Sequence, residues 1–357
     1  MLPAMNTIRR FVAICSLVGI PFALLAQSDS SVSLLVLSKR DHTLAVVDAT
    51  TLKVVAKAPV GNDPHEVVAS ADGRTAWVSN YGSGQYNTLA AIDLVNAKAL
   101  PSVDLGPLHG PHGLTFVGGK TWFTAEAAKA IGRYDPATAK VDWILGTGQN
   151  RTHMIWVSAD QQRIITTNVS SGTVSLMERE ALRMPGPPPG GPSQGGGGPP
   201  PRPAGDGKDW NEVVVKVGNG SEGFDLSPDE KEIWVANAQD GTISVIDYAA
   251  KKVVATLQAN VGGANRLKFT NDGKRVLVST LSGPDLVVLD AVTRKEIKRV
   301  TIGHGAAGIE MEPNGKRAFV ACTPDGWVAV IDLVTLTMTG KIDAGPEPDG
   351  MAWAVRR

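Results

Sequence analysis

The sequence predicts an all-β fold, a seven-bladed β-propeller with four-stranded blades. Three observations predict it. A short phrase ending in an acidic residue recurs seven times at nearly constant spacing, the segments between copies alternate apolar and polar residues around tight-turn sequences, and the final copy is too short to complete a blade alone. Repeats of about 40 to 45 residues with four strands each are typical of propeller blades.

The recurring phrase consists of two mostly apolar residues followed by an acid. It ends at Asp48, Asp93, Asp135, Glu178, Asp247, Asp290 and Asp332. Successive copies lie 42 to 45 residues apart, except for one step of 69 residues from Glu178 to Asp247. Because every blade carries this acid, we expect it to close a turn by hydrogen bonding rather than to catalyse a reaction.

The segments between these acids are predicted to be hairpins. In 224–237, the turn Ser227-Pro228-Asp229 separates two stretches in which Val, Ile and Trp alternate with other residues. Proline at the second position of a tight turn and β-branched or aromatic residues in the flanks both favour a hairpin. The predicted blades are 64–106, 111–148, 152–218, 222–260, 264–303, 306–344, and 349–355 combined with 32–60.

The last of these blades is predicted to close the ring. Only one strand, Asp349–Ala354, follows the final turn, and the N-terminal segments Ser33–Leu37 and Thr43–Asp48 belong to the missing strands. A 3+1 clasp of N- and C-terminal strands would remove the unpaired edge that an open ring leaves.

Residues 234–247, with Trp-Val-Ala-Asn followed by Gly-Thr-Ile-Ser-Val-Ile-Asp, resemble the YVTN repeat of periplasmic and surface-layer β-propellers. The resemblance extends over nearly all of the chain after residue 26. It implies the propeller fold and leaves the activity open, because propellers host many functions. The asparagine of the motif is kept at Asn80, Asn168 and Asn237. Its equivalents in the other repeats are Glu126, Thr280, Cys322 and Ser38.

The N-terminus is predicted to be a signal peptide, 1–26. Arg9 and Arg10 precede the apolar stretch Phe11–Ala26, and Ala26 is an acceptable cleavage position. We therefore expect a periplasmic or secreted propeller domain, 27–357, with no membrane span after cleavage. The alternative is an N-terminal anchor that is retained.

Charge and cysteine content limit the classes of function. The chain has 35 basic and 35 acidic residues, and we find no nucleic-acid-binding signature. Cys15 lies in the predicted signal peptide, so Cys322 would remain alone, without an internal disulfide partner. No Cys-x-x-Cys-His motif for covalent haem attachment is present. We expect a monomer.

A Pro/Gly-rich insert, 184–209, accounts for the long step between repeats. It has almost no apolar side chains to offset the cost of ordering the chain, so we expect a disordered loop inside the third blade. The alternative interpretation is a proline-rich ligand for a partner protein.

A histidine series is the main functional signal. His65, His112 and His153 stand at equivalent positions, at the start of the innermost strand of three successive blades. Glu222, Asn265, Ala307 and Asp349 take this position in the other four. Innermost strands line the central channel, so these side chains should form a ring at one mouth. Three imidazoles and a carboxylate suit a divalent transition metal, with His65, His112, His153 and Glu222 as predicted ligands.

Further side chains are expected on the same face. Asn265, Asp349, Glu126, Arg151 and Arg266 complete the predicted ligand-binding set, and Asn80, Tyr81, Asn168, Asn237 and Cys322 mark the ends of the second strands. The alternative without a site is that duplication of the repeat copied these histidines, which then only hydrogen-bond neighbouring blades or water.

Three functions remain open on this sequence. The first is a binding module that holds a small-molecule or protein ligand at the channel mouth. The second is a metal-dependent lyase, lactonase or oxidoreductase that uses the same ring. The third is a structural or surface-layer scaffold. No G-x-S-x-G, P-loop or H-E-x-x-H motif selects among them.

Overall fold

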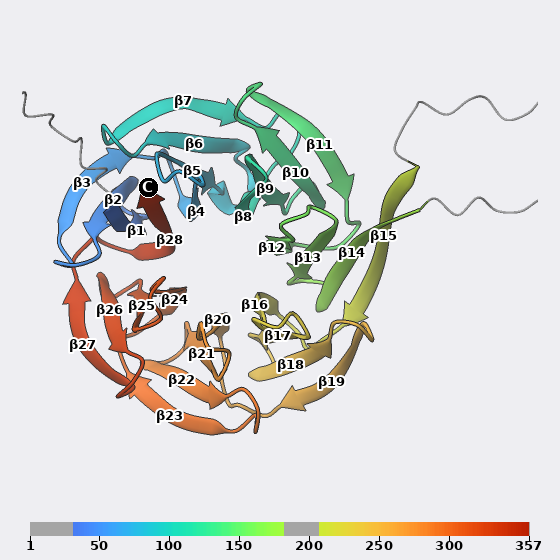
Figure 1. Ribbon diagram of the computed structural model, residues 1–357, viewed down its shortest axis with the longest axis vertical. Coiled ribbons are helices and arrows are strands. Elements are labelled where there is room, and N and C mark those ends of the chain that lie inside the picture. Colours follow the sequence, from blue (N-terminus) through green and yellow to red (C-terminus); the bar gives the residue numbers. More distant parts are fainter. Residues whose placement is uncertain (1–30, 182–206, 357) are drawn as a thin grey trace, which may run out of the picture.

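The computed structural model describes residues 31–181 and 207–356. They form seven antiparallel four-stranded sheets arranged as blades around one axis (Figure 1). The predicted seven-bladed propeller is therefore confirmed. The predicted signal peptide, 1–26, lies outside the described residues.

The blades follow the chain in order, and each runs from an innermost strand to an outermost one. The innermost strands are β4 (Pro64–Ala69), β8 (Pro111–Val117), β12 (Thr152–Val157), β16 (Ser221–Leu226), β20 (Ala264–Phe269), β24 (Ala306–Met311) and β28 (Pro348–Arg356). The second strands are β5 (Thr75–Asn80), β9 (Lys120–Ala125), β13 (Arg163–Asn168), β17 (Glu232–Asn237), β21 (Arg275–Thr280), β25 (Arg317–Cys322) and β1 (Ser31–Ser38). We number the blades 1 to 7 in this order.

The two outer layers complete each blade. The third strands are β6 (Thr88–Asp93), β10 (Ala130–Asp135), β14 (Thr173–Ala181), β18 (Thr242–Asp247), β22 (Asp285–Asp290), β26 (Trp327–Asp332) and β2 (Thr43–Asp48). The outermost strands are β7 (Lys98–Asp104), β11 (Lys140–Gly146), β15 (Lys208–Lys216), β19 (Lys252–Leu257), β23 (Glu296–Thr301), β27 (Thr337–Ile342) and β3 (Val54–Pro59).

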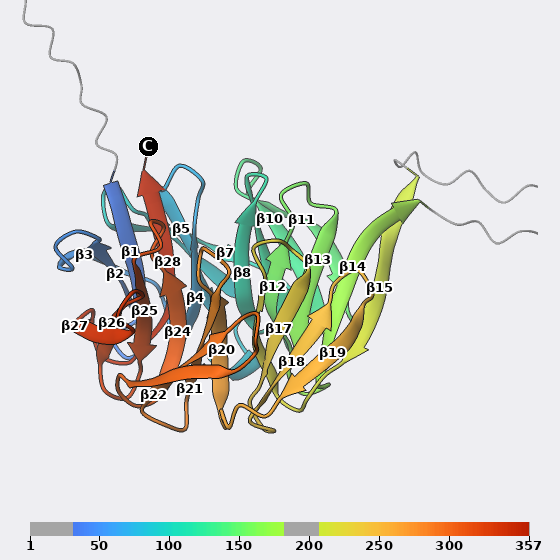
Figure 2. The ribbon, with the colours of Figure 1, turned by 60° about the horizontal axis from the view of Figure 1, so that its bottom comes forward.

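Blade 7 joins the two ends of the chain. Its strand order is β28-β1-β2-β3, and β1 pairs with β28 from Ser31 opposite Arg356 to Ser38 opposite Pro348. The side view shows β1 and β28 next to each other (Figure 2). The C-terminal strand therefore enters a sheet whose other three strands are N-terminal, as the predicted clasp requires.

The apolar core lies between neighbouring blades. One cluster contains Leu34 and Val36 of blade 7 together with Phe319 and Val328 of blade 6, all at most 1% exposed. Second and third strands are buried along most of their length, whereas outermost strands such as β11 alternate exposed and half-buried residues. Because each sheet is covered only by its neighbours, a single blade cannot bury its faces alone.

The six recurring aspartates close turns, as the sequence predicts, whereas Glu178 lies within the ladder of β14 and β15 and pairs with Lys251 instead. Oδ1 of Asp48 accepts backbone hydrogen bonds from Thr50 (3.1 Å) and Thr51 (2.6 Å). Asp290 does the same with Val292 (3.0 Å) and Thr293 (2.6 Å). These bonds lower the pKa of both aspartates and satisfy donors in the turn between the third and outermost strands.

The long step between repeats belongs to the hairpin of β14 and β15, which extends outward beyond the ring (Figure 1). The predicted insert, 184–209, lies outside the described residues except at its end. There Lys208 and Asp209 begin β15 and pair with Ala181 and Glu180. Trp210 packs against Trp143 of blade 2, with the ring centroids 5.6 Å apart.

The described residues contain one short 3-10 helix, Gly82–Gly84. In residues 31–181 and 207–356, no helix has the length and apolar character needed to cross a bilayer.

Glycines let the innermost strands approach one another around the axis. A Cβ on Gly113 of β8 would lie 2.4 Å from the carbonyl oxygen of His153 in β12, and one on Gly350 of β28 would lie 2.1 Å from that of His65 in β4. Gly223 and Gly308 meet the next innermost strand in the same way. Four of the seven blades therefore contact their neighbour at backbone distance immediately after the ring position.

We predict that Gly113→Ala destabilises the protein by about 1–3 kcal/mol, because the added methyl group would overlap the backbone of β12. Gly146→Ala is the matched control, since a Cβ there meets nothing within 4 Å. Urea unfolding followed by tryptophan fluorescence measures both. Equal stability of the two variants would contradict the close approach of β8 and β12.

Candidate functional site at the channel mouth

A β-bulge places the ring residues in the channel. In every blade, the pairing of the innermost strand with the second strand shifts register at this point, for example between Pro111 and Leu114 in β8 and between Thr152 and Ile155 in β12. His112 and His153 lie within these shifts. A bulge redirects a side chain out of the regular alternation of a strand, so the same position in each blade turns toward the axis.

The three predicted histidines lie in a row. The ring centroids of His112 and His153 are 3.9 Å apart, and those of His65 and His112 are 5.1 Å apart. Tyr81, which follows β5, lies 4.8 Å from His65 and 5.3 Å from His112 by the same measure. The structure thus brings together imidazoles that are 88 residues apart in sequence, from His65 to His153.

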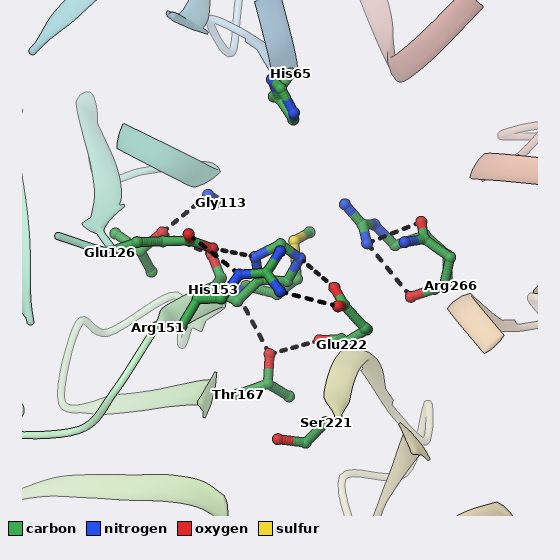
Figure 3. A network of polar contacts seen from close by, with 12 residues as sticks. His65, Gly113, Glu126, Arg151, His153, Thr167, Ser221, Glu222 and Arg266 are labelled. Carbon is green, nitrogen blue, oxygen red and sulfur yellow. Dashed lines mark hydrogen bonds and ion pairs between the residues drawn. The ribbon is translucent and has the colours of Figure 1, made fainter. Parts of the chain in front are cut away.

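His153 lies between two carboxylates (Figure 3). Its Nδ1–H donates to Oε1 of Glu126, and its Nε2 lies 2.8 Å from Oε2 of Glu222. The Arg151 guanidinium contacts both carboxylates, at 3.4 Å each. The Tyr81 hydroxyl donates to Oε2 of Glu126 at 2.5 Å. Two anions and two cations therefore balance within one network when His153 is protonated, with only Arg151 substantially exposed.

The two adjacent imidazoles have opposite pKa shifts. Burial and the positive neighbours His153 and His65 lower the pKa of His112 well below its usual value. Burial also opposes protonation of His153, but Glu222 and Glu126 outweigh it and raise that pKa. Burial alone would raise the pKa of Glu222, but its contacts with His153 and Arg151 outweigh this effect and lower the pKa to about 2. His112 is accordingly neutral where His153 is an imidazolium.

Three donor groups are close enough to share an ion. One donor atom from each of His112, Glu126 and His153 lies within 4.8 Å of the others, and all three residues are buried. Nδ1 of His112 is also buried and has no hydrogen-bond partner among the described residues. This group shares His112 and His153 with the metal set predicted from sequence and contains Glu126, which the sequence indicates only as a ligand-binding residue.

The other two predicted metal ligands have partners of their own. Nε2 of His65 lies 2.8 Å from the Lys39 ammonium, and its Nδ1 lies 3.2 Å from the carbonyl oxygen of Asp63. Glu222 is held by His153 and Arg151. The remaining predicted residues line the same region: Lys39 also contacts Asp349 at 3.2 Å, and Nη1 of Arg266 donates to Oδ1 of Asn265 at 3.0 Å.

The amides at the ends of the second strands serve the fold. Nδ2 of Asn237 donates to the hydroxyls of Thr242 and Ser244 at 2.9 Å each, and Asn168 makes the equivalent bonds to Thr173 and Ser175. Nδ2 of Asn80 donates to backbone carbonyl groups. Cys322 is buried, and burial raises the pKa of its thiol to about 12, so it is not a nucleophile at neutral pH.

Hydroxyls that bridge neighbouring blades were not predicted from the sequence. Oγ1 of Thr124 accepts from the Gly113 amide at 2.9 Å and donates to the His153 carbonyl at 2.6 Å. Thr167 and Ser279 stand at the same repeat position and donate to the carbonyls of Glu222 and Ala307. Their signal is a hydroxyl one residue before the end of the second strand, which an overlay of the repeats could have shown.

Comparison with known proteins supports the fold. Residues 202–316 match the sequence profile of the family described as the Cytochrome D1 heme domain. That match covers the outermost strand of blade 3, blade 4, blade 5 and part of blade 6, and it excludes His65, His112 and His153. No curated protein sequence matches the chain.

Solved structures superimpose on nearly the whole chain. A functionally unknown protein from Desulfotomaculum acetoxidans has 13% identity and a TM-score of 0.69, over 90% of this chain and 98% of its own. The present chain therefore has the fold of the seven-bladed propellers. Kuenenia stuttgartiensis hydrazine synthase gives 17% identity and 0.65, over 84% and 92% of the two chains. The dihydro-heme d1 dehydrogenase NirN gives 15% and 0.57, over 88% and 64%.

We predict that Thr124→Val destabilises the protein by about 1–3 kcal/mol, because it leaves a buried amide and a buried carbonyl without their partner. Thr121→Val, in the same strand, is the control: its hydroxyl is buried and makes no hydrogen bond among the described residues, so its loss should be neutral or stabilising. Chemical denaturation of both variants measures the difference. Equal free energies of unfolding for Thr124→Val and Thr121→Val would show that the Thr124 hydrogen bonds do not stabilise the protein.

Proposed function

We propose that the chain is an exported binding propeller that holds a divalent transition metal ion at the channel mouth through His112, Glu126 and His153. The observation that supports this most is the buried, neutral His112, whose Nδ1 lacks a partner among the described residues and lies beside a carboxylate and a second imidazole. Export is part of the proposal and rests on the predicted signal peptide.

The donor set favours a borderline transition metal. Two imidazoles and a carboxylate are the ligands that Zn²⁺ accepts in open sites, in which a fourth position remains for water or a bound molecule. His153 carries a proton between Glu126 and Glu222, so it becomes a ligand only by releasing that proton when the ion binds. Hard cations such as Ca²⁺ are bound almost exclusively by oxygen ligands. Tyr81, His65 and Arg151 surround this group and would contact a molecule bound at the fourth position.

The shell around these residues supports the proposal. Ligating imidazoles and carboxylates in metal sites are oriented by further hydrogen bonds. Tyr81 and Arg151 contact Glu126, and the bridging hydroxyl of Thr124 binds the backbone of His153. The ligands are therefore held by neighbours even before an ion is considered.

A haem group does not fit between these residues. The partial match to the Cytochrome D1 heme domain suggests testing this group. His112 and His153 are only 3% and 2% exposed, and their ring centroids are 3.9 Å apart. A porphyrin-sized plane cannot reach an imidazole nitrogen without opening the mouth. A single ion needs no such space.

An acid–base enzyme on the same face is the second candidate. Neighbouring groups with pKa values pushed in opposite directions are typical of acid and base pairs, and His112 and His153 form such a pair. In that case a chelator would leave turnover of a test ester or lactone unchanged, and His112→Ala would abolish it. The proposed binding propeller predicts no turnover of either substrate, with or without the chelator.

We predict that the full chain binds one Zn²⁺ by isothermal titration, and that His112→Ala weakens this binding by at least about tenfold to a hundredfold because a direct ligand is lost. His109→Ala is the control, since His109 is exposed and contacts the carbonyl of Gln85 rather than the cluster. Zn²⁺ binding that is equal in both variants, or absent from the wild type, would overturn the proposed function.

A further inference from the structure

The channel contains a cavity beyond the histidine cluster along the axis. It measures about 330 Å³, and residues from all seven innermost strands line it. Its charged lining residues are Glu66, Asp225, Arg266, Lys268 and Glu310. The volume is at the lower end of the range for small-molecule sites.

An ion pair lines this cavity directly after the ring positions His65 and Asn265 in the two strands that carry it. Arg266 of blade 5 contacts Oε1 of Glu66 in blade 1, and the two residues are 200 positions apart in sequence. Both side chains are largely buried, at 11% and 13% exposure. The contact crosses the channel, and His65, His112 and His153 are not among the residues that line the cavity. The two sites are therefore distinct.

The cavity has an unbalanced charge. Arg266 pairs with Glu66, and Nζ of Lys268 lies 3.8 Å from Oδ1 of Asp225. Glu310 makes no hydrogen bond and no ion pair within the described parts of the chain. Burial raises its pKa to about 7, against the attraction of Lys268. With Glu310 ionised, three carboxylates face two cations, so a positive charge is missing.

Much of the cavity wall is apolar. Trp156, Phe224 and Trp353 line the cavity together with Met154 and Met351. Trp353 packs edge-on against Phe319, which fixes its plane, and its buried Nε1 has no hydrogen-bond partner among the described residues. Aromatic faces attract organic cations, and more strongly where water is excluded.

We propose that this cavity binds a small organic cation, an ammonium group attached to a compact apolar body. Glu310 pairs with the ammonium, and the aromatic walls contact the apolar part. The cavity is distinct from the metal site proposed at the other mouth, because none of His112, Glu126 and His153 lines it.

The probe is 2-phenylethylammonium, titrated calorimetrically into the full chain. Its anionic and neutral counterparts, 3-phenylpropanoate and 2-phenylethanol, test whether charge decides binding. We expect the ammonium to bind at least about tenfold more tightly than either, as one buried charge contact implies. Preference for the anion, equal binding of all three, or no binding of the ammonium would overturn the proposal.

Glu310→Gln should weaken binding of the ammonium by about tenfold or more. Glu212→Gln is the control, because Glu212 is exposed on the outermost strand β15. Zn²⁺ and ammonium titrations of Glu310→Gln and His112→Ala separate the two sites: the Glu310→Gln protein should keep zinc binding, and the His112→Ala protein should keep ammonium binding. An unchanged ammonium affinity in Glu310→Gln would contradict the assignment.

The wild type offers a measurement that needs no variant. The ammonium stays charged from pH 5.5 to 8, whereas Glu310 ionises in this range among Glu66, Asp225, Arg266 and Lys268. Affinity should therefore rise by about tenfold from pH 5.5 to 8. A flat or falling affinity would exclude Glu310 as the partner of the ammonium.

Discussion

The close approach of the innermost strands around one axis is the constraint on which the rest of this structure depends. At Gly113 and Gly350, the backbone of one blade occupies the space that a side chain would need. The hydroxyl of Thr124 then joins two neighbouring strands across the same gap. Because these contacts narrow the channel, side chains from different blades meet directly at the axis.

The narrow channel makes its charged groups interact strongly. Glu126 and Glu222 stabilise a positive charge on His153, and that charge in turn helps to keep His112 neutral. Further along the axis, the Arg266–Glu66 pair crosses the channel, and the Glu310 carboxyl makes no ion pair with the described residues, although Lys268 attracts it. One axis thus carries two chemically different regions, one rich in imidazole and one with an unpaired carboxyl among aromatic residues.

The sequence predicts the fold well because each blade repeats the same local signals. The acids at Asp48 and Asp290, the hairpin turns and the short last repeat were enough to place seven blades and the clasp. The ring of histidines was also visible, since a repeat position becomes a ring by symmetry. The set of donor groups that converge, His112, Glu126 and His153, could not be predicted. His65 is excluded from it by a contact with Lys39, and that contact joins blade 7 to blade 1, so no single repeat contains it. The position of Glu310 was missed for a similar reason. Its carboxyl lacks an ion pair because Arg266 pairs with Glu66 and Lys268 with Asp225.

The most direct test of this account is anomalous diffraction at the zinc absorption edge from crystals grown with Zn²⁺. We expect one dominant peak inside the channel, about 2.0–2.2 Å from an imidazole nitrogen of His112, one of His153 and a carboxylate oxygen of Glu126. Peaks only at exposed histidines such as His109 and His304, with none between blades 2 and 3, would show that the convergence of these side chains does not form a metal site.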